Sequence, residues 1–240
     1  YQTSDYVLGL AMTLTAGGSG LDDMRVLRED PGLRAMTLPG LPAANSLGDF
    51  LRRFKHRTIA GLAGVNAKML RRVLAEWEHK VLTLDIDSSL VEADKRAALW
   101  TYKGFPGYNP LLVWVAELDM FLAGVFRAGN ASPQSHIRSL LRWCRKALPA
   151  GIKLRVRSDS AGYRLDVMDY CMKHDIEFVI GADLDPAVLE AIEGIPDDKW
   201  QLVVRGNDTF LLGETIHVPG VGNNAWNIPA CRLIVTKKLS

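Results

Sequence analysis

The sequence predicts an α/β fold in which a mixed β-sheet carries helices on its faces. Three observations predict it. The chain changes at residue 81 from helical to strand-rich, five strand-like segments follow, and two amphipathic segments separate the last three of them. From residue 81 the predicted order is therefore β-β-β-α-β-α-β. Three sequential strands paired as a meander, followed by helical crossovers, give a mixed sheet.

Residues 1–80 predict a small helical domain. Asp30-Pro31-Gly32 is expected to end the second helix, and Asn45 or Ser46 to cap the third. Leu47, Phe50, Leu51 and Phe54 repeat at i, i+3, i+4 and i+7, which is one apolar stripe on a helix. The helices are expected at residues 6–14, 21–29, 47–54 and 66–79.

The strand predictions rest on apolar and alternating segments. Leu82, Leu84 and Ile86 are expected to point to one face of the first strand, and Thr83, Asp85 and Asp87 to the other. Short segments separated by Gly and Asn turns predict a β-rich region at residues 200–240. The core strands are expected at Val81–Asp87, Pro110–Ala116, Phe121–Arg127, Ile152–Ser158 and Glu177–Gly181, and the core helices from Ser132-Pro133 onward and at Arg164–His174.

Composition excludes several classes of protein. No apolar run approaches the ~20 residues of a membrane span, and the first residues lack the pattern of a signal peptide. We therefore expect a soluble, cytoplasmic protein. The three cysteines match no zinc spacing, and the five histidines show no ligand spacing. Net charge is only +2, but much of the basic surplus lies between Arg52 and Arg72.

The candidate site consists of two aspartates. The predicted strand order is that of an RNase H-like core, in which the first and fourth strands are neighbours. Asp87 and Asp159, which end those strands, are then expected to converge at one sheet edge. Two nearby carboxylates repel unless cations bridge them, and oxygen ligands suit Mg²⁺ or Mn²⁺. The alternative is that Asp87 caps a turn through Ser88 and that Asp159 caps the following helix.

Several motifs, in order, resemble insertion-sequence DDE transposases. They lie at the first and fourth strands, between the first two strands, and in the helical N-terminal segment. The residues concerned are Asp85–Ser89, Tyr102-Lys103-Gly104, Gly107–Leu111, Arg157–Tyr163, Ala16-Gly17-Gly18, Leu21-Asp22-Asp23, Leu27–Pro31 and Ser46–Phe54.

The resemblance implies a DNA transposase that cleaves and transfers strands at transposon ends with Mg²⁺ or Mn²⁺. Asp87 matches the first catalytic aspartate, with Asp85 as a competing metal ligand, and Asp159 matches the second. The family's third acid is a Glu on a helix beyond a β-rich insertion. Glu214 lies in a predicted turn that does not match, so the third acid is expected beyond residue 240. The start at Tyr1 suggests a trimmed fragment.

The resemblance also divides the chain and predicts its partners. Residues 1–80 would be a helical DNA-binding domain, residues 81–199 the RNase H-like catalytic core, and residues 200–240 an incomplete β-rich insertion. Double-stranded DNA is the expected partner, with a homodimer on paired ends. The expected DNA contacts are Arg52, Arg53, Lys55, Arg57, Lys103, Tyr108 and Arg157.

Structural roles without DNA contact also stay open for these residues. The first four cations also fit a solvated helix face, Lys103 a turn, and Tyr108 a core packing role, while Arg157 would either neutralise Asp159 or touch DNA. Two rival functions also stay open. One is an RNase H-like nuclease without strand transfer, and the other is a catalytically inactive DNA-binding relic.

Overall fold

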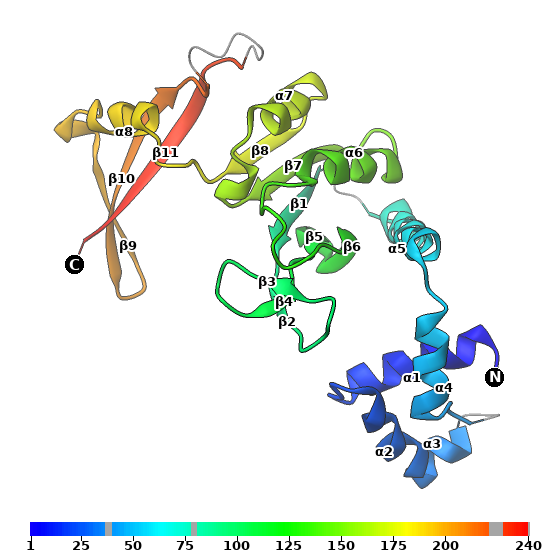
Figure 1. Ribbon diagram of the computed structural model, residues 1–240. Coiled ribbons are helices and arrows are strands. Elements are labelled where there is room, and N and C mark those ends of the chain that lie inside the picture. Colours follow the sequence, from blue (N-terminus) through cyan, green and yellow to red (C-terminus); the bar gives the residue numbers. More distant parts are fainter. Residues whose placement is uncertain (37–39, 78–80, 221–227, 240) are drawn as a thin grey trace. The chain divides into compact units, whose positions relative to one another are not determined.

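The computed structural model describes residues 1–36, 40–77, 81–220 and 228–239, with the side chains of residues 56, 57 and 60 left out (Figure 1). The chain forms two compact units, Tyr1–Leu62 and Ala63–Ser240. None of the described helices is both long enough and apolar enough to cross a membrane.

The first unit is a helical cluster around one small core. Tyr6 stacks on Phe50 with ring centroids 4.5 Å apart, and Met24, Leu41 and Leu47 complete the buried set. Its elements are α1 (Thr3–Thr15), a 3₁₀ turn (Leu21–Asp23), α2 (Met24–Glu29), α3 (Pro31–Met36) and α4 (Ala44–Arg52).

One local prediction for this unit is confirmed and one is wrong. Helix α2 ends at Glu29 with Asp30 as its C-cap, as predicted. Pro31 then begins α3, because the first helical position needs no N–H, and the Asp30 carboxylate accepts a hydrogen bond from Leu33 N at 2.8 Å. Helix α4 starts at Ala44 with Ala43 as its N-cap, so Asn45 lies inside the helix.

Helix α5 (His56–Ala75) begins ten residues before its predicted start. From Ala63 onward it belongs to the second unit. Ala67, Leu70 and Leu74 are buried in the core of that unit, and Arg71 Nε donates to the carbonyl of Ala147 at 2.7 Å. The division into compact units therefore falls at residue 62, while the functional domain boundary at residue 80 stays a prediction.

The second unit is built on a five-stranded sheet of order β6-β5-β1-β7-β8. The pairs β1–β5 and β5–β6 are antiparallel, and the pairs β1–β7 and β7–β8 are parallel. This is the predicted RNase H-like arrangement, which is confirmed. The strands are β1 (Val81–Ser88), β5 (Leu111–Val115), β6 (Met120–Val125), β7 (Lys153–Ser158) and β8 (Glu177–Ile180).

Helices α5, α6 (Ile137–Ala147) and α7 (Leu165–Lys173) cover one face of this sheet. Leu82, Leu84 and Ile86 are buried with them, as the alternation predicts. Helix α6 begins at Ile137, later than predicted, because the carbonyls of Ser132, Pro133 and Ser135 accept hydrogen bonds from the Arg127 side chain instead of entering a helix.

A three-stranded sheet that the sequence does not predict follows β1 and precedes β5 in the chain. It consists of β2 (Val91–Glu92), β3 (Leu99–Trp100) and β4 (Pro106–Tyr108), with β4 in the centre. Strands of two or three residues are too short to show a periodicity. Gly129 lies so close to the carbonyls of Leu99 and Gly107 that a side chain there would collide with both.

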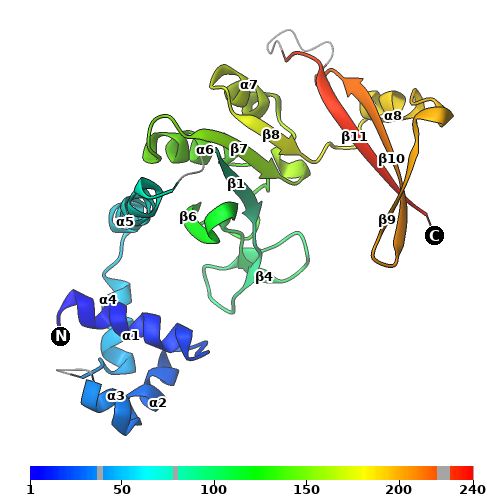
Figure 2. The ribbon, with the colours of Figure 1, turned by 180° about the vertical axis from the view of Figure 1, so that it is seen from behind.

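A third sheet follows the core, as predicted for residues 200–240. It is antiparallel, and α8 (Pro186–Glu193) packs against its central strand (Figure 2). Asp185 caps α8 by accepting a hydrogen bond from Val188 N at 2.9 Å. Glu214 lies within a strand, not in the predicted turn. The strands are β9 (Gln201–Arg205), β10 (Asp208–His217) and β11 (Cys231–Leu239).

Candidate metal site

The register between β1 and β7 brings the two predicted aspartates to adjacent positions. Paired residues on these parallel strands are 72 positions apart (153 − 81). The pairing runs from Val81 with Lys153 to Ile86 with Ser158 and includes Asp85 with Arg157. The same offset (159 − 87) aligns Asp87 with Asp159, one position beyond the last pair. Both aspartates line one cavity of about 960 Å³ at the carboxyl ends of the two strands.

Asp87 accepts one local hydrogen bond and Asp159 accepts two, the weaker of them from Ser158 Oγ at 3.5 Å. Asp87 Oδ1 accepts from Ser88 N at 2.7 Å, and Asp159 Oδ1 accepts from Ala161 N at 3.1 Å. These are the contacts of the capping interpretation. They use one oxygen of each carboxylate, and no Lys, Arg or His of the described residues pairs with either. Capping and cation binding are therefore compatible.

Asp85 has a different environment. Arg157 donates from Nε to Asp85 Oδ1 and from Nη2 to Asp85 Oδ2, both at 2.6 Å. Such a two-bonded fork satisfies both carboxylate oxygens, and the hydrogen bonds and charge of Asp85 raise the pKa of Arg157. Arg157 thus neutralises Asp85 rather than Asp159, so Asp85 has a partner that Asp87 does not.

The neighbouring cations on this face of the sheet are also paired. Glu177 on β8 accepts from Arg155 at 2.7 Å and pairs with Lys153 at 2.7 Å. Hydrogen bonds from these two side chains lower the pKa of Glu177. The face opposite the helices therefore carries two sets of ion pairs, and the unpaired carboxylates are at its edge.

Tyr163 and His217 form a polar contact at the same cavity, which the sequence does not predict. Tyr163 Oη and His217 Nε2 are 2.8 Å apart, and both residues line the cavity with the aspartates. Burial raises the pKa of Tyr163 to about 12, so its hydroxyl stays protonated at neutral pH. The contact joins the segment after Asp159 to β10. Tyr163 belongs to the motif around Asp159, but no sequence spacing connects it to His217.

The predicted DNA-contact residues lie in three places. In the first unit Arg52 pairs with Asp49 at 2.7 Å, and Arg53 and Lys55 are exposed. The side chain of Arg57 lies outside the described part of the structure. In the second unit Lys103 is exposed after β3, and the Tyr108 ring lies 4.7 Å from that of Phe126.

The donor chemistry at the sheet edge fits a hard divalent cation, because both free ligands are carboxylate oxygens. Within the described ranges, no group of three or more His, Cys, Asp or Glu is placed to hold a metal ion. Glu214 is engaged elsewhere, because Arg232 donates to both of its oxygens at 2.6 and 2.5 Å. The described residues thus supply two candidate ligands.

One comparison with models of protein families matches most of the chain. The family model described as "Transposase DDE domain group 1" matches residues 1–215. A search of curated proteins finds no match.

Several solved transposase structures are similar to this chain at low identity. The Mos1 mariner catalytic domain is 9% identical, with 58% of this chain and 72% of that chain covered and a TM-score of 0.32. The piggyBac synaptic complex with hairpin DNA is 13% identical, with 97% and 52% covered and a TM-score of 0.43. The Drosophila P element strand transfer complex is 13% identical, with 82% and 49% covered and a TM-score of 0.33. This chain thus spans about half the length of the last two.

Proposed function

Because the chain belongs to the transposase DDE domain family, group 1, we propose that it cleaves DNA at transposon ends and transfers the cut strand, using Mg²⁺ or Mn²⁺ held by Asp87 and Asp159. The observation that carries the assignment is the β1–β7 register, which aligns these two carboxylates at one cavity. A third acid, which the resemblance implies, is assigned to no described residue.

The roles of the surrounding residues follow from their contacts. Bound cations would activate the attacking hydroxyl and offset charge on the leaving oxygen. The backbone N–H groups of Ser88 and Ala161 orient the two carboxylates. Arg157 engages both oxygens of Asp85, which makes that carboxylate a weaker candidate ligand than Asp87. Tyr163 and His217 border the cavity as a hydrogen-bonded pair.

Double-stranded DNA is the proposed partner, bound by a homodimer. Arg52, Arg53, Lys55 and Arg57 would contact its backbone from the helical unit, and Lys103 from the small sheet. Arg157 is withdrawn from direct DNA contact in this proposal, because its guanidinium is engaged by Asp85. Tyr108 packs on Phe126, which supports a packing role.

The proposal is tested with the protein that contains this chain, a DNA fragment bearing a labelled transposon end, and Mg²⁺. Asp87→Asn and Asp159→Asn are expected to abolish strand cleavage and transfer. Asp94→Asn, an exposed aspartate between β2 and β3, is the matched control and should retain both. Mn²⁺ binding, measured by calorimetry without DNA, should weaken in the first two variants and not in the control.

Three results would overturn the proposal. Cleavage and transfer that survive both aspartate substitutions would remove the site. Cleavage without joining would favour the RNase H-like nuclease. DNA binding without cleavage, together with no Mn²⁺ binding by the unaltered protein, would favour the inactive DNA-binding relic.

A further inference from the structure

In one long stretch of the core, every Lys, Arg, Asp or Glu is basic. Residues 120–158 contain eight Lys and Arg and no Asp or Glu, in a chain whose net charge is only +2. Four of these cations have structural partners, namely Arg127 in the loop before α6 and Lys153, Arg155 and Arg157 on β7. The other four are Arg138, Arg142, Arg145 and Lys146, all on α6.

The packing of α6 aligns three of them. Ile137, Leu141 and Cys144 face the core, so Arg138, Arg142 and Lys146 are exposed. Residues four apart lie on the same helix face, about 6 Å apart along the axis. The three cations therefore form a row about 12 Å long.

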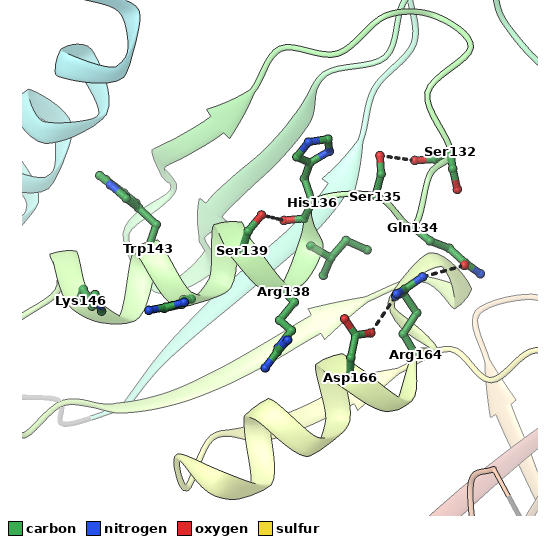
Figure 3. A pocket seen from close by; sticks show the side chains of 12 residues that line it. Ser132, Gln134, Ser135, His136, Arg138, Ser139, Trp143, Lys146, Arg164 and Asp166 are labelled. Atoms are coloured by element: carbon green, nitrogen blue, oxygen red, sulfur yellow. Dashed lines mark hydrogen bonds and ion pairs between the residues drawn. The ribbon is translucent and has the colours of Figure 1, made fainter. Parts of the chain in front are cut away.

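No carboxylate of the described residues pairs with this row. Like charges four residues apart on a helix destabilise it, so an anionic partner would relieve the repulsion. The row lines an open groove of about 800 Å³ between α6 and the start of α7. Its one acidic lining residue, Asp166, is engaged by Arg164 Nε at 2.8 Å. Figure 3 shows Arg138 reaching into the space between the two helices.

The groove begins at the sheet edge where the two aspartates lie. Strand β6 is antiparallel to β5 and β5 is antiparallel to β1, so β6, β1 and β7 all run in one direction. Helix α6 follows β6 and α7 follows β7, so both helices start from the edge that carries Asp87 and Asp159. Polar groups of Gln134 and Ser135 line the groove at this end.

From the unpaired row, the open groove and this position, we infer that α6 binds the phosphate backbone of double-stranded DNA through Arg138, Arg142 and Lys146. Arg and Lys are the usual donors to phosphate oxygens. One DNA strand carries a phosphate about every 3.4 Å along the axis, so a 12 Å row faces about three to four of them. DNA as the ligand rests on the proposed function, whereas the phosphate chemistry rests on the row itself.

The test measures DNA affinity rather than cleavage. Arg138→Ala, Arg142→Ala and Lys146→Ala are combined in one variant of the full chain. Lys95→Ala, Arg96→Ala and Arg205→Ala, three exposed cations away from the groove, form a control with the same loss of charge. Binding of a fluorescent 30-base-pair duplex is measured by anisotropy from 50 to 300 mM salt, with EDTA present so that no metal chemistry contributes.

Each phosphate contact adds about 0.9 to the slope of log affinity against log salt. The groove variant should therefore lose about 2.7 from that slope and bind up to about 100-fold more weakly at 0.15 M salt, while the control keeps the original slope. An unchanged slope in the groove variant, or an equal loss in the control, overturns the inference. Circular dichroism of both variants checks that they fold.

The experiments distinguish failure of the α6 contact from failure of the transposase proposal. If the unaltered protein binds DNA through α6 but never cleaves it, the α6 contact stands and the transposase proposal falls. If Asp87→Asn abolishes cleavage and the groove variant binds DNA normally, the reverse holds.

Discussion

Asp85 and Arg157 face each other across the β1–β7 ladder and are joined by two hydrogen bonds of 2.6 Å, directly beside the aligned positions of Asp87 and Asp159. This pairing gives Asp85 and Asp87, two aspartates that lie two residues apart on one strand, different environments. Asp85 is charge-neutralised within the protein, and Asp87 keeps an oxygen for an external cation.

The first prediction concerns this distinction. Asp85→Asn should leave Mn²⁺ affinity within a few-fold of the unaltered protein, because the lost carboxylate was already engaged. Asp87→Asn should lower it at least about tenfold, which corresponds to about 1.4 kcal/mol. Calorimetric titration of both variants measures the difference. Equal losses would show that Asp85 shares the metal. Because the Asp85 and Arg157 side chains are 32% and 55% exposed, Asp85→Asn should cost no more than about 1 kcal/mol of stability.

The second prediction concerns the contact between Tyr163 and His217. Tyr163→Phe should lower the free energy of unfolding by about 1 kcal/mol at pH 7, since one hydrogen bond at a part-buried position is lost. The pKa of Tyr163 is raised from 10.0 to about 12, so folding favours the protonated phenol. That contribution to stability is present below pH 10 and is lost as pH rises through about 12.

Denaturant unfolding of both proteins between pH 7 and 12 tests this assignment. The unaltered protein should lose more stability than Tyr163→Phe above pH 10. Parallel pH profiles for the two proteins would contradict it.

The third prediction concerns Arg127, which is 4% exposed. Its guanidinium donates to the carbonyl of Asn109 at 2.7 Å and to that of Ser135 at 2.8 Å. Burial lowers the pKa of Arg127, because an environment with little water disfavours the charged form. Arg127→Met should leave buried carbonyls unpaired and cost at least about 2 kcal/mol of stability.

Arg142→Met is the matched control for Arg127, because Arg142 is exposed on α6. Its melting temperature should stay within about a degree of the unaltered value, since surface substitutions rarely exceed 0.5 kcal/mol. A similar loss in both variants would show that the loop before α6 does not depend on Arg127.

The fourth prediction concerns Gly129. A Cβ at this position would collide with the backbone carbonyls of Leu99 and Gly107, and backbone cannot move aside as a side chain can. Gly129→Ala should therefore destabilise the protein by about 1–3 kcal/mol. Gly64→Ala, on α5 with open space at its Cβ, should stabilise it by about 0.5–1 kcal/mol. Thermal unfolding measures the stability of both variants. Equal changes in stability, of either sign, would contradict the close backbone approach at Gly129.

Several structural elements were predictable because their signal is local. The alternation in Val81–Ser88 predicts a strand with Leu82, Leu84 and Ile86 inward, and burial confirms it. The start of α8 is equally local, since Asp185 and Pro186 suit a helix N-terminus by themselves. The early start of α5 was missed, because Gly61 and Gly64 weaken its helical pattern.

By itself, the sequence determined the order of the core strands and the placing of Asp87 and Asp159 at strand ends, because side-chain alternation and turn chemistry act over a few residues. Only the tertiary structure decided that Arg157 binds Asp85, that Tyr163 meets His217, and that the cations of α6 line a groove. The first two contacts join residues 72 and 54 positions apart, and the groove lies between helices from separate parts of the chain. They depend on strand register and helix packing, which arise when the whole core forms.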